Sequence, residues 1–292
     1  MIIPVNKPAG MTSHDVVAKI KRAMKNAEKI GHTGTLDPMC TGVLPVLTGK
    51  YTKLSDLLPS DKAYRCGILL GKTTDTQDVT GNILTESDEV VSEDEFKAVL
   101  PHFIGEQRQV PPMYSAIKKD GVPRYKLARK GIEIEREARI ITIYDIVYES
   151  SPAENEFVFT VKCSSGTYIR TLCEDIGRKL GCGACMESLE RILSNGFSLE
   201  QAHSLEEVIE AAGEGTLEKL SCDCESAFSQ LKSVTIPENG LKYYLNGGVI
   251  AFDRVGFSAS EGTLCRAYSE NSRFLGLAAA QKDGIKNIWS EL

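Results

Sequence analysis

The sequence predicts a fold that mixes α-helices with β-strands and ends in a small all-β domain. Two stretches with alternating apolar residues, 140–148 and 157–163, are typical of half-buried strands. Signals for the start of a helix also occur in this first part of the chain, before and after these strand-like stretches. After Leu231, short strand-like pieces are separated by Gly, Ser and Asn, which is typical of a small β-barrel. We therefore expect one domain over residues 1–231 and a second over 232–292.

Local signals place the first elements of the larger domain. Thr12 and Ser13 precede an amphipathic run with a basic outer face, which predicts a helix. The window 31–46, with its glycines and small polar residues, is interpreted as a loop. Residues 64–70 (YRCGILL) form an apolar run, which predicts a buried strand ending at Gly71.

Three later stretches predict further helices. Residues 92–95 (SEDE) form a capping box, and apolar residues follow at helical spacing up to Gly105. A helical pattern covers residues 171–181 and ends in glycine. Residues 204–207 (SLEE) form a second capping box, which marks the start of another helix.

The bulk composition is that of an ordinary globular protein. Of its 292 residues, 42% are hydrophobic, 25% are charged and nine are cysteines. The odd number of cysteines, together with the lack of a secretory leader or a membrane-length apolar run, predicts reduced thiols and a cytoplasmic protein with no membrane partner. The net charge of −6 argues weakly against nucleic acid as a partner.

The distribution of charge is more informative than its sum. The stretch 107–131 is polar and too long for an ordinary connection, which favours a functional loop. It holds a basic cluster with two tyrosines interleaved: Tyr114, Lys118, Lys119, Arg124, Tyr125, Lys126, Arg129 and Lys130. A charge run is most often a solvated surface, but interleaved aromatic residues favour contact with nucleic acid.

Two other chemistries are disfavoured by spacing. Residues 66–73 (CGILLGKT) end like a phosphate-binding loop, but the upstream glycine is one residue too close and the apolar residues belong in a strand. The cysteine pairs in 182–185 and 222–224 could supply thiolates to zinc, but the second pair has a single intervening residue and no histidine lies near either. We therefore predict no metal.

A cysteine or histidine nucleophile is a third possibility. His32 lies five residues before Asp37, and Cys40 follows shortly after. No recognised nucleophile motif surrounds these residues. The hypothesis of a thiol nucleophile is therefore weak.

Asp37 is the one fully charged side chain between Lys29 and Lys50. A structural interpretation is that Asp37 and Pro38 form the N-cap and first position of a helix. A catalytic interpretation is that the acid is held among uncharged groups, where it needs a cationic partner to stay ionised. Arg170, which follows a different predicted strand, is a candidate partner. The two interpretations do not exclude each other.

The stretches considered so far belong to a larger set that resembles one family. GHTGTLDPMCTGVLPV, VNKPAGMTSHDVV, KAYRCGILLGKTTDTQD, VPPMYSAIKKDGVPRYKLARKG and SSGTYIRTL together resemble the motifs of the TruB-type tRNA pseudouridine synthases, in the same order and spacing. The resemblance covers most of residues 2–180. It implies an α+β pseudouridine-synthase domain around a central, mostly antiparallel sheet, with a PUA-like RNA-binding barrel at the C-terminal end.

The resemblance also implies a reaction: isomerisation of a uridine to pseudouridine at position 55, in the T loop of tRNA. The uridine must be flipped out of the folded loop. Asp37 would be the catalytic aspartate, acting on the ribose as the N-glycosidic bond breaks. Tyr64 would stack on the flipped base and help to remove the C5 proton, and Arg170 would pair with Asp37.

Further residues would bind substrate or support the site. His32 would fill the space left by extruded nucleotides, Lys7 would support the active-site fold, and Tyr168 and Leu189 would line the pocket. In the basic loop, the residues implied to contact tRNA include Lys118, Lys119 and Arg124.

No cofactor is implied, because the isomerisation transfers neither electrons nor phosphate. The presence of the basic loop implies an enzyme that acts without a guide RNA, and we expect a monomer. One departure from the family pattern is Glu190, which replaces a basic residue next to Leu189. A function from another class, a non-catalytic tRNA-binding or tRNA-folding protein, fits the same scaffold, but such a protein would not need Asp37.

Overall fold

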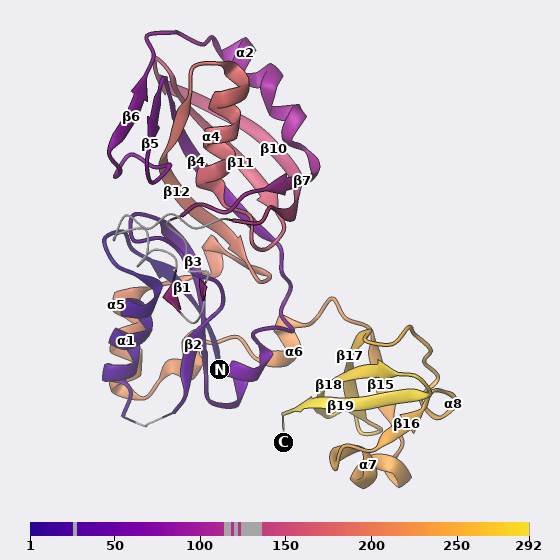
Figure 1. The fold of residues 1–292 in the computed structure, drawn as a ribbon. Helices are drawn as coiled ribbons and strands as arrows, with labels where there is room; N and C mark the ends of the chain where they lie inside the picture. Colours follow the sequence, from indigo (N-terminus) through magenta and orange to yellow (C-terminus); the bar gives the residue numbers. More distant parts are fainter. Residues whose placement is uncertain (26–27, 114–117, 120–121, 124–135, 292) are drawn as a thin grey trace.

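A ten-stranded sheet forms the centre of the larger part of the molecule (Figure 1). The computed structural model describes residues 1–25, 28–113, 118–119, 122–123 and 136–291. The strand order is β14-β1-β3-β12-β4-β11-β10-β7, with β13 added to β12 and β2 added to β3. The strands are β1 (Ile2–Lys7), β2 (Ile30–His32), β3 (Thr41–Thr48), β4 (Lys62–Leu70), β7 (Gly105–Gln109), β10 (Arg139–Ala153), β11 (Glu156–Cys163), β12 (Ala184–Ser194), β13 (Phe197–Ser198) and β14 (His203–Ser204).

The sheet is mostly antiparallel, as the resemblance implied. Two pairings are parallel, β1 with β14 and β3 with β12. The second of these joins the two halves of the sheet. Smaller hairpins are formed by β5 (Lys72–Thr74) with β6 (Ile83–Glu86) and by β8 (Lys118–Lys119) with β9 (Val122–Pro123).

Helices cover both halves of the sheet. Those of the larger part are α1 (Ser13–Ala23), α2 (Glu93–Val99), α4 (Ile169–Leu180), α5 (Leu205–Glu214) and α6 (Cys224–Ala227), with 3-10 turns η1 (Gly49–Leu54), η2 (Leu100–Phe103), η3 (Leu199–Gln201) and η4 (Leu217–Leu220). The capping boxes predicted at the starts of α2 and α5 are present. Thr12 caps α1 and likewise forms a capping box, with Asp15.

The prediction of a loop over residues 31–46 was wrong at both ends. β2 includes Gly31 and His32, and β3 begins at Thr41. The run TGVLPVLT is a strand buried on both faces: Leu44 and Val46 contact α1 and α5, whereas Val43 and Leu47 face a different core. Such strands are continuously apolar and lack alternation. The central part, residues 33–40, is the loop.

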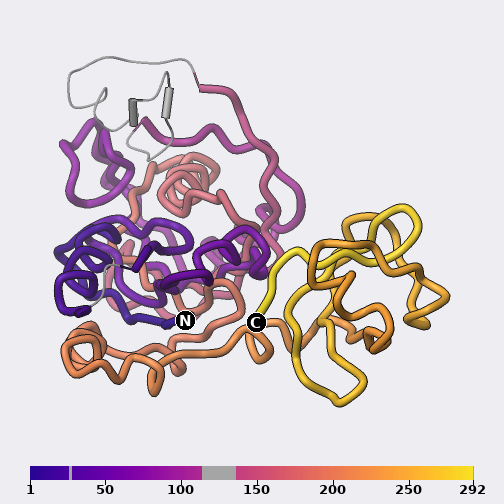
Figure 2. The backbone as a smooth tube through the Cα atoms, turned by 90° about the horizontal axis from the view of Figure 1, so that it is seen from below, coloured from indigo at the N-terminus to yellow at the C-terminus, as the bar shows by residue number. Residues whose placement is uncertain are grey.

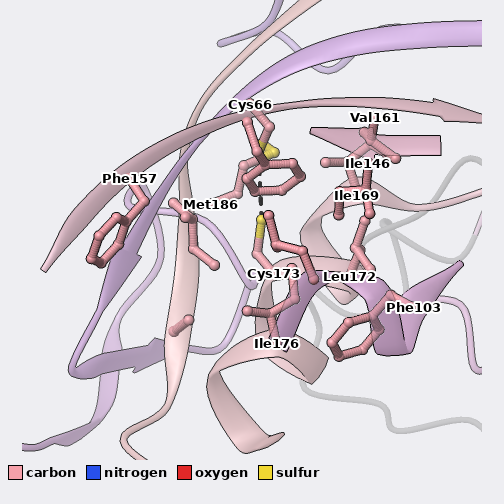
Figure 3. Close-up of a cluster of buried hydrophobic side chains, with 14 of the residues drawn as sticks. Cys66, Phe103, Ile146, Phe157, Val161, Ile169, Leu172, Cys173, Ile176 and Met186 are labelled. Carbon is pink, nitrogen blue, oxygen red and sulfur yellow. Dashed lines mark hydrogen bonds between the residues drawn. The ribbon is translucent and has the colours of Figure 1, made fainter. Parts of the chain in front are cut away.

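The main core lies where α2 and α4 pack on β4, β10, β11 and β12, and Figure 3 shows the side chains of α4 within it. The buried side of α4 contributes Leu172, Cys173 and Ile176. The thiols of Cys66 and Cys173 meet at 3.5 Å. This packing fixes the orientation of α4, whose first turn carries Arg170.

A second sheet begins at Ser233 (Figure 1), and Figure 2 shows that this last part of the chain lies to one side of the rest. It is curled, a half-barrel with the order β15-β17-β18-β19-β16, formed by β15 (Ser233–Ile236), β16 (Val249–Ala251), β17 (Leu264–Ser269), β18 (Phe274–Gln281) and β19 (Gly284–Ser290). Two short helices, α7 (Glu238–Leu245) and α8 (Phe252–Val255), accompany it.

The two parts of the molecule touch at η1. The rings of Tyr51 and Trp289 pack edge to face, with centroids 5.2 Å apart. The Trp289 Nε1 group donates a hydrogen bond to the Lys50 carbonyl at 3.3 Å. Among the described residues, no helix has both the length and the apolarity that a membrane span requires.

A close approach between α4 and β12 provides a test of the fold. A Cβ atom on Gly177 would lie 2.3 Å from the backbone nitrogen of Ala184. Gly177→Ala should therefore lower the free energy of unfolding by about 2 kcal/mol, because α4 would be pushed off the sheet. Gly213→Ala in α5 is the control, since nothing lies within 4 Å of its added methyl. In urea unfolding, an equal effect of the two substitutions would contradict the packing described.

Candidate active site

A cavity of about 340 Å³ opens where four segments of the sheet and its loops meet. Its lining residues come from the loop after β2, the start of β4, the turn before α4 and the middle of β12. Asp37, Tyr64, Tyr168, Arg170 and Leu189 are all among its lining residues. Five of the predicted site residues therefore come together, although they lie up to 152 positions apart in the chain.

Asp37 lies on a turn in the loop between β2 and β3. The Cys40 amide donates to the Asp37 carbonyl at 3.1 Å, and the next element is strand β3. The interpretation of Asp37 and Pro38 as the start of a helix was therefore wrong. The carboxylate remains 41% exposed and faces the cavity, so a substrate can reach it.

Arg170 forms the expected ion pair with Asp37. Its Nη2 atom lies 2.9 Å from Asp37 Oδ2, and the arginine side chain is only 6% exposed. Its Nη1 atom donates to the Thr76 carbonyl at 2.9 Å. The guanidinium is thus held by contacts at both Nη atoms, and its Nη2 atom faces the carboxylate of Asp37.

Asp78 is a second acid on the same guanidinium, and sequence reasoning gave it no role. Its Oδ2 atom lies 3.6 Å from Arg170 Nη1, and both side chains are buried. Thr76 Oγ1 and the Thr80 amide donate to Asp78 Oδ1 at 2.8 and 3.0 Å. The available signal in the sequence was the acid that ends the quoted stretch KAYRCGILLGKTTDTQD. If such a carboxylate is buried, a cation is expected beside it, because carboxylates are rarely buried without one.

Tyr64 and Leu189 form an apolar wall of the cavity. Both are buried, at 6% and 9% exposed, and come from the neighbouring strands β4 and β12. Burial raises the pKa of Tyr64 to about 12, which the nearby Arg191 opposes. The phenol is therefore protonated at neutral pH. Glu190 departs from the family pattern, but its neighbour Leu189 still lines the cavity.

Tyr168 occupies the N-cap position of α4 and lines the cavity. The buried side chain of Gln109 holds its backbone from both sides. The Tyr168 amide donates to Gln109 Oε1 at 2.8 Å, and Gln109 Nε2 donates to the Tyr168 carbonyl at 3.0 Å. This clamp, reaching across from β7, sets the position at which Arg170 enters the site.

Lys7 and His32 are not among the lining residues of the cavity. Lys7 is fully buried and donates to the carbonyls of Pro8, Met11 and Pro38, so it supports the turn that follows Asp37. His32 lies on β2, and its Nδ1 atom is buried without a hydrogen-bond partner in the described structure. Burial, aided by the charge of Arg191, lowers the pKa of His32 and favours the neutral ring.

Arg191 is a structural support that sequence reasoning missed. It is fully buried on β12 and donates to three carbonyls: Val43 at 2.7 Å, Gly34 at 3.0 Å and Thr35 at 3.4 Å. These bonds tie the loop of Asp37 to the sheet. Gly42 allows the close contact, because a Cβ atom there would lie 2.3 Å from the Arg191 carbonyl oxygen and its φ is +104°.

Two further titratable groups line the cavity. Burial lowers the pKa of Lys62 to about 8, and the charge of Arg191 acts in the same direction. Burial, followed by the charge of Asp37, raises the pKa of Cys40 to about 12. A thiol with such a pKa is a poor nucleophile at neutral pH, which further disfavours the hypothesis of a cysteine nucleophile.

The cysteine pairs considered for zinc lie in different cores. Cys182 belongs to the core under α4, whereas Cys224 packs near η1 and Trp289. Within the described ranges, no cluster of three or more His, Cys, Asp or Glu side chains could hold a metal ion.

The basic loop is described only in part. Lys118 and Lys119 form β8, which pairs with β9. Tyr114 and the part of the basic cluster from Arg124 to Lys130 lie outside the described residues.

Family models cover most of the larger part of the chain. One described as "TruB family pseudouridylate synthase (N terminal domain)" matches residues 21–169. Another, "tRNA pseudouridylate synthase B C-terminal domain", matches residues 170–232.

Several curated proteins are similar over nearly their whole length. The tRNA pseudouridine synthase B of Clostridium perfringens (strain 13 / Type A) is 44% identical over 289 residues, covering 98% of this chain and 96% of that protein. The protein of the same name from Geotalea uraniireducens is 44% identical over 293 residues, covering 99% and 94%.

Solved structures share the fold. A chain in "Structure of H/ACA RNP bound to a substrate RNA containing 2'-deoxyuridine" aligns with a TM-score of 0.75 and 25% identity, covering 100% of this chain and 84% of that one. A chain in "Crystal Structure of a Cbf5-Nop10-Gar1 Complex" aligns with a TM-score of 0.74 and 29% identity, covering 97% and 79%.

The role of Arg191 can be tested through stability. Arg191→Met should lower the free energy of unfolding by roughly 3 kcal/mol, because the buried carbonyl of Val43 and the part-buried carbonyls of Gly34 and Thr35 lose their donor. Arg191→Lys should recover only part of this loss, since one ammonium cannot reproduce the fork of the guanidinium.

Arg65→Met is the matched control for this measurement. Arg65 lies on the adjacent strand β4, where it forms an exposed ion pair with Glu149 at 2.7 Å, and its loss should cost less than about 1 kcal/mol. If urea unfolding gave the same small loss for both arginines, Arg191 would not be the support described here.

Proposed function

The chain belongs to the TruB family of pseudouridylate synthases, and on this basis we propose that it converts uridine to pseudouridine at position 55, in the T loop of tRNA. It is an enzyme of the pseudouridine synthase type. The names of its similar relatives support tRNA as the substrate. The observation that carries the proposal is the Asp37–Arg170 ion pair at the wall of a cavity large enough for a flipped base.

Asp37 is the catalytic carboxylate in this proposal. The reaction breaks the bond from N1 to C1′, turns the detached uracil and forms a bond from C5 to C1′, after which C5 loses a proton. The carboxylate serves either as a nucleophile at C1′ or through a glycal route, and both roles need it ionised. The 2.9 Å contact with Arg170 favours that ionised form.

Tyr64, Tyr168 and Leu189 hold the flipped uracil in this proposal. Their aromatic and apolar surfaces line the cavity and can replace the stacking that the base loses on leaving the RNA. The phenol of Tyr64 is protonated at the start of the reaction, because its pKa is raised. It can therefore accept the proton from C5 only if it gives its own proton to another group. His32, on β2 just before the loop of Asp37, fills the gap left in the RNA.

RNA binding is assigned to two further regions. The basic loop over residues 107–131, with Lys118, Lys119 and Arg124, binds the T arm by its phosphates. Residues 232–292, proposed as a PUA-like domain, provide a second RNA contact. The enzyme acts as a monomer, without a guide RNA or a cofactor, and a tRNA substrate places the reaction in the cytoplasm.

A non-catalytic tRNA-binding or tRNA-folding role is the alternative from another class. The same basic loop and scaffold would serve it. It gives no reason for a reachable carboxylate held by a buried arginine, which the catalytic proposal explains. The two roles can also coexist in one protein.

Asp37→Asn separates these functions. We expect it to abolish pseudouridine formation, measured as tritium release from C5-labelled uridine in a T-arm transcript, and to leave transcript binding within about threefold of wild type. Asp56→Asn, at an exposed turn residue, is the control and should be fully active. Full activity of Asp37→Asn would reject the proposed mechanism.

The basic loop is tested by charge removal. Replacing Lys118, Lys119, Arg124 and Lys126 with serine should weaken T-arm binding and flatten the dependence of log affinity on log salt concentration, by about 0.7 to 0.9 for each lost phosphate contact. Replacing the exposed residues Lys97 and Lys219 with serine should change neither quantity. An unchanged slope in the loop variant would remove the loop from the binding surface.

A further inference from the structure

A second cationic group lies in the cavity wall, apart from the Asp37–Arg170 pair. It consists of Lys62 at the start of β4 and Arg191 behind it on β12. We propose that the Lys62 ammonium, reinforced by the charge of Arg191, binds a backbone phosphate next to the target nucleotide and so positions the flipped nucleotide over Asp37. The inference rests on the proposed function, since it needs an RNA substrate.

The geometry brings both cations to one point beside the Asp37 loop. A Cβ atom placed on Gly34 would lie 2.6 Å from Lys62 Nζ and 3.6 Å from Arg191 Nη1. Gly34 precedes Thr35, which lines the cavity together with Lys62. Lys62 therefore lines the cavity, and its ammonium lies beside Gly34, on the side where the loop of Asp37 leaves β2.

Within the residues that the structure describes, no carboxylate neutralises the positive charge of this pair. Within the described part of the chain, neither Lys62 nor Arg191 forms an ion pair with a carboxylate. Arg191 uses its donors on three carbonyls, and Asp37 is engaged by Arg170. A half-buried cation repelled by a second one is unfavourable unless an anion binds, and the lowered pKa of Lys62 reflects this cost.

A phosphate is the anion that suits this arrangement. Lysine binds phosphate as a point charge, and its flexible stem tolerates a backbone that shifts as a base leaves the stack. Arg191 is fully buried and three of its N–H groups donate to backbone carbonyls, so the ammonium of Lys62 makes the contact and the guanidinium adds positive potential. Fixing a phosphate beside the flipped nucleotide would hold C1′ near Asp37, which lies on the same cavity wall.

The test pairs a protein change with a substrate change. T-arm RNAs would carry one neutral methylphosphonate at each linkage near the target uridine, with a 2′-O-methyl group on the preceding sugar in every substrate, including the charged reference. For wild type we expect one linkage at which neutralisation lowers kcat/KM by roughly tenfold or more. For Lys62→Met, the same linkage should cause no further loss, whereas Lys62→Arg should restore the sensitivity.

Lys97→Met is the matched control, because Lys97 is exposed and paired with Glu93 at 2.8 Å. It should behave as wild type at every linkage. Equal losses in wild type and Lys62→Met at all linkages would overturn the phosphate contact. If Lys62→Met did not fold, wild type alone would still test the proposal. A wild-type kcat/KM that stays unchanged on neutralisation of every linkage would overturn the phosphate contact. Failure of wild type to modify the charged reference RNA would overturn the proposed function, and the phosphate contact with it.

Discussion

The buried guanidinium of Arg170 needs negatively charged and carbonyl partners, and meeting that need organises the site. An unpaired charge in such a position would cost several kcal/mol. Asp37 arrives from the loop after β2, and Asp78 and the Thr76 carbonyl arrive from the turn between β5 and β6. One side chain at the start of α4 thus holds together three segments that are distant in sequence.

The two acids on this arginine differ in ways that suit different roles. Asp78 is buried and accepts hydrogen bonds from Thr76 and Thr80, so its geometry is fixed. Asp37 is far more exposed and faces the cavity. Asp78 can therefore keep the guanidinium in place while Asp37 stays open to the cavity. This division lets a single buried cation serve both the fold and the proposed chemistry.

Strand β12 carries the second support of the site. Its register with β4 places Arg191 opposite Tyr64, and its short parallel pairing with β3 places Arg191 beside Gly42. The loop of Asp37 is consequently anchored at Arg191 on one side and at Lys7 on the other. Both anchors are buried cations that donate to backbone carbonyls, so these two anchors involve no carboxylate.

The sequence by itself determined the family, the capped helices and five residues of the cavity, because motifs and caps are local patterns that survive in any context. It also singled out Asp37 as an isolated acid, and Arg170 as its candidate partner. It misplaced β3, since a strand buried on both faces has no alternation to reveal it. Only the tertiary structure showed that Asp78 shares Arg170, that Arg191 anchors the Asp37 loop and that Lys62 faces the cavity. Each of these depends on side chains meeting across strands and loops, and neither local propensity nor spacing along the chain encodes such meetings.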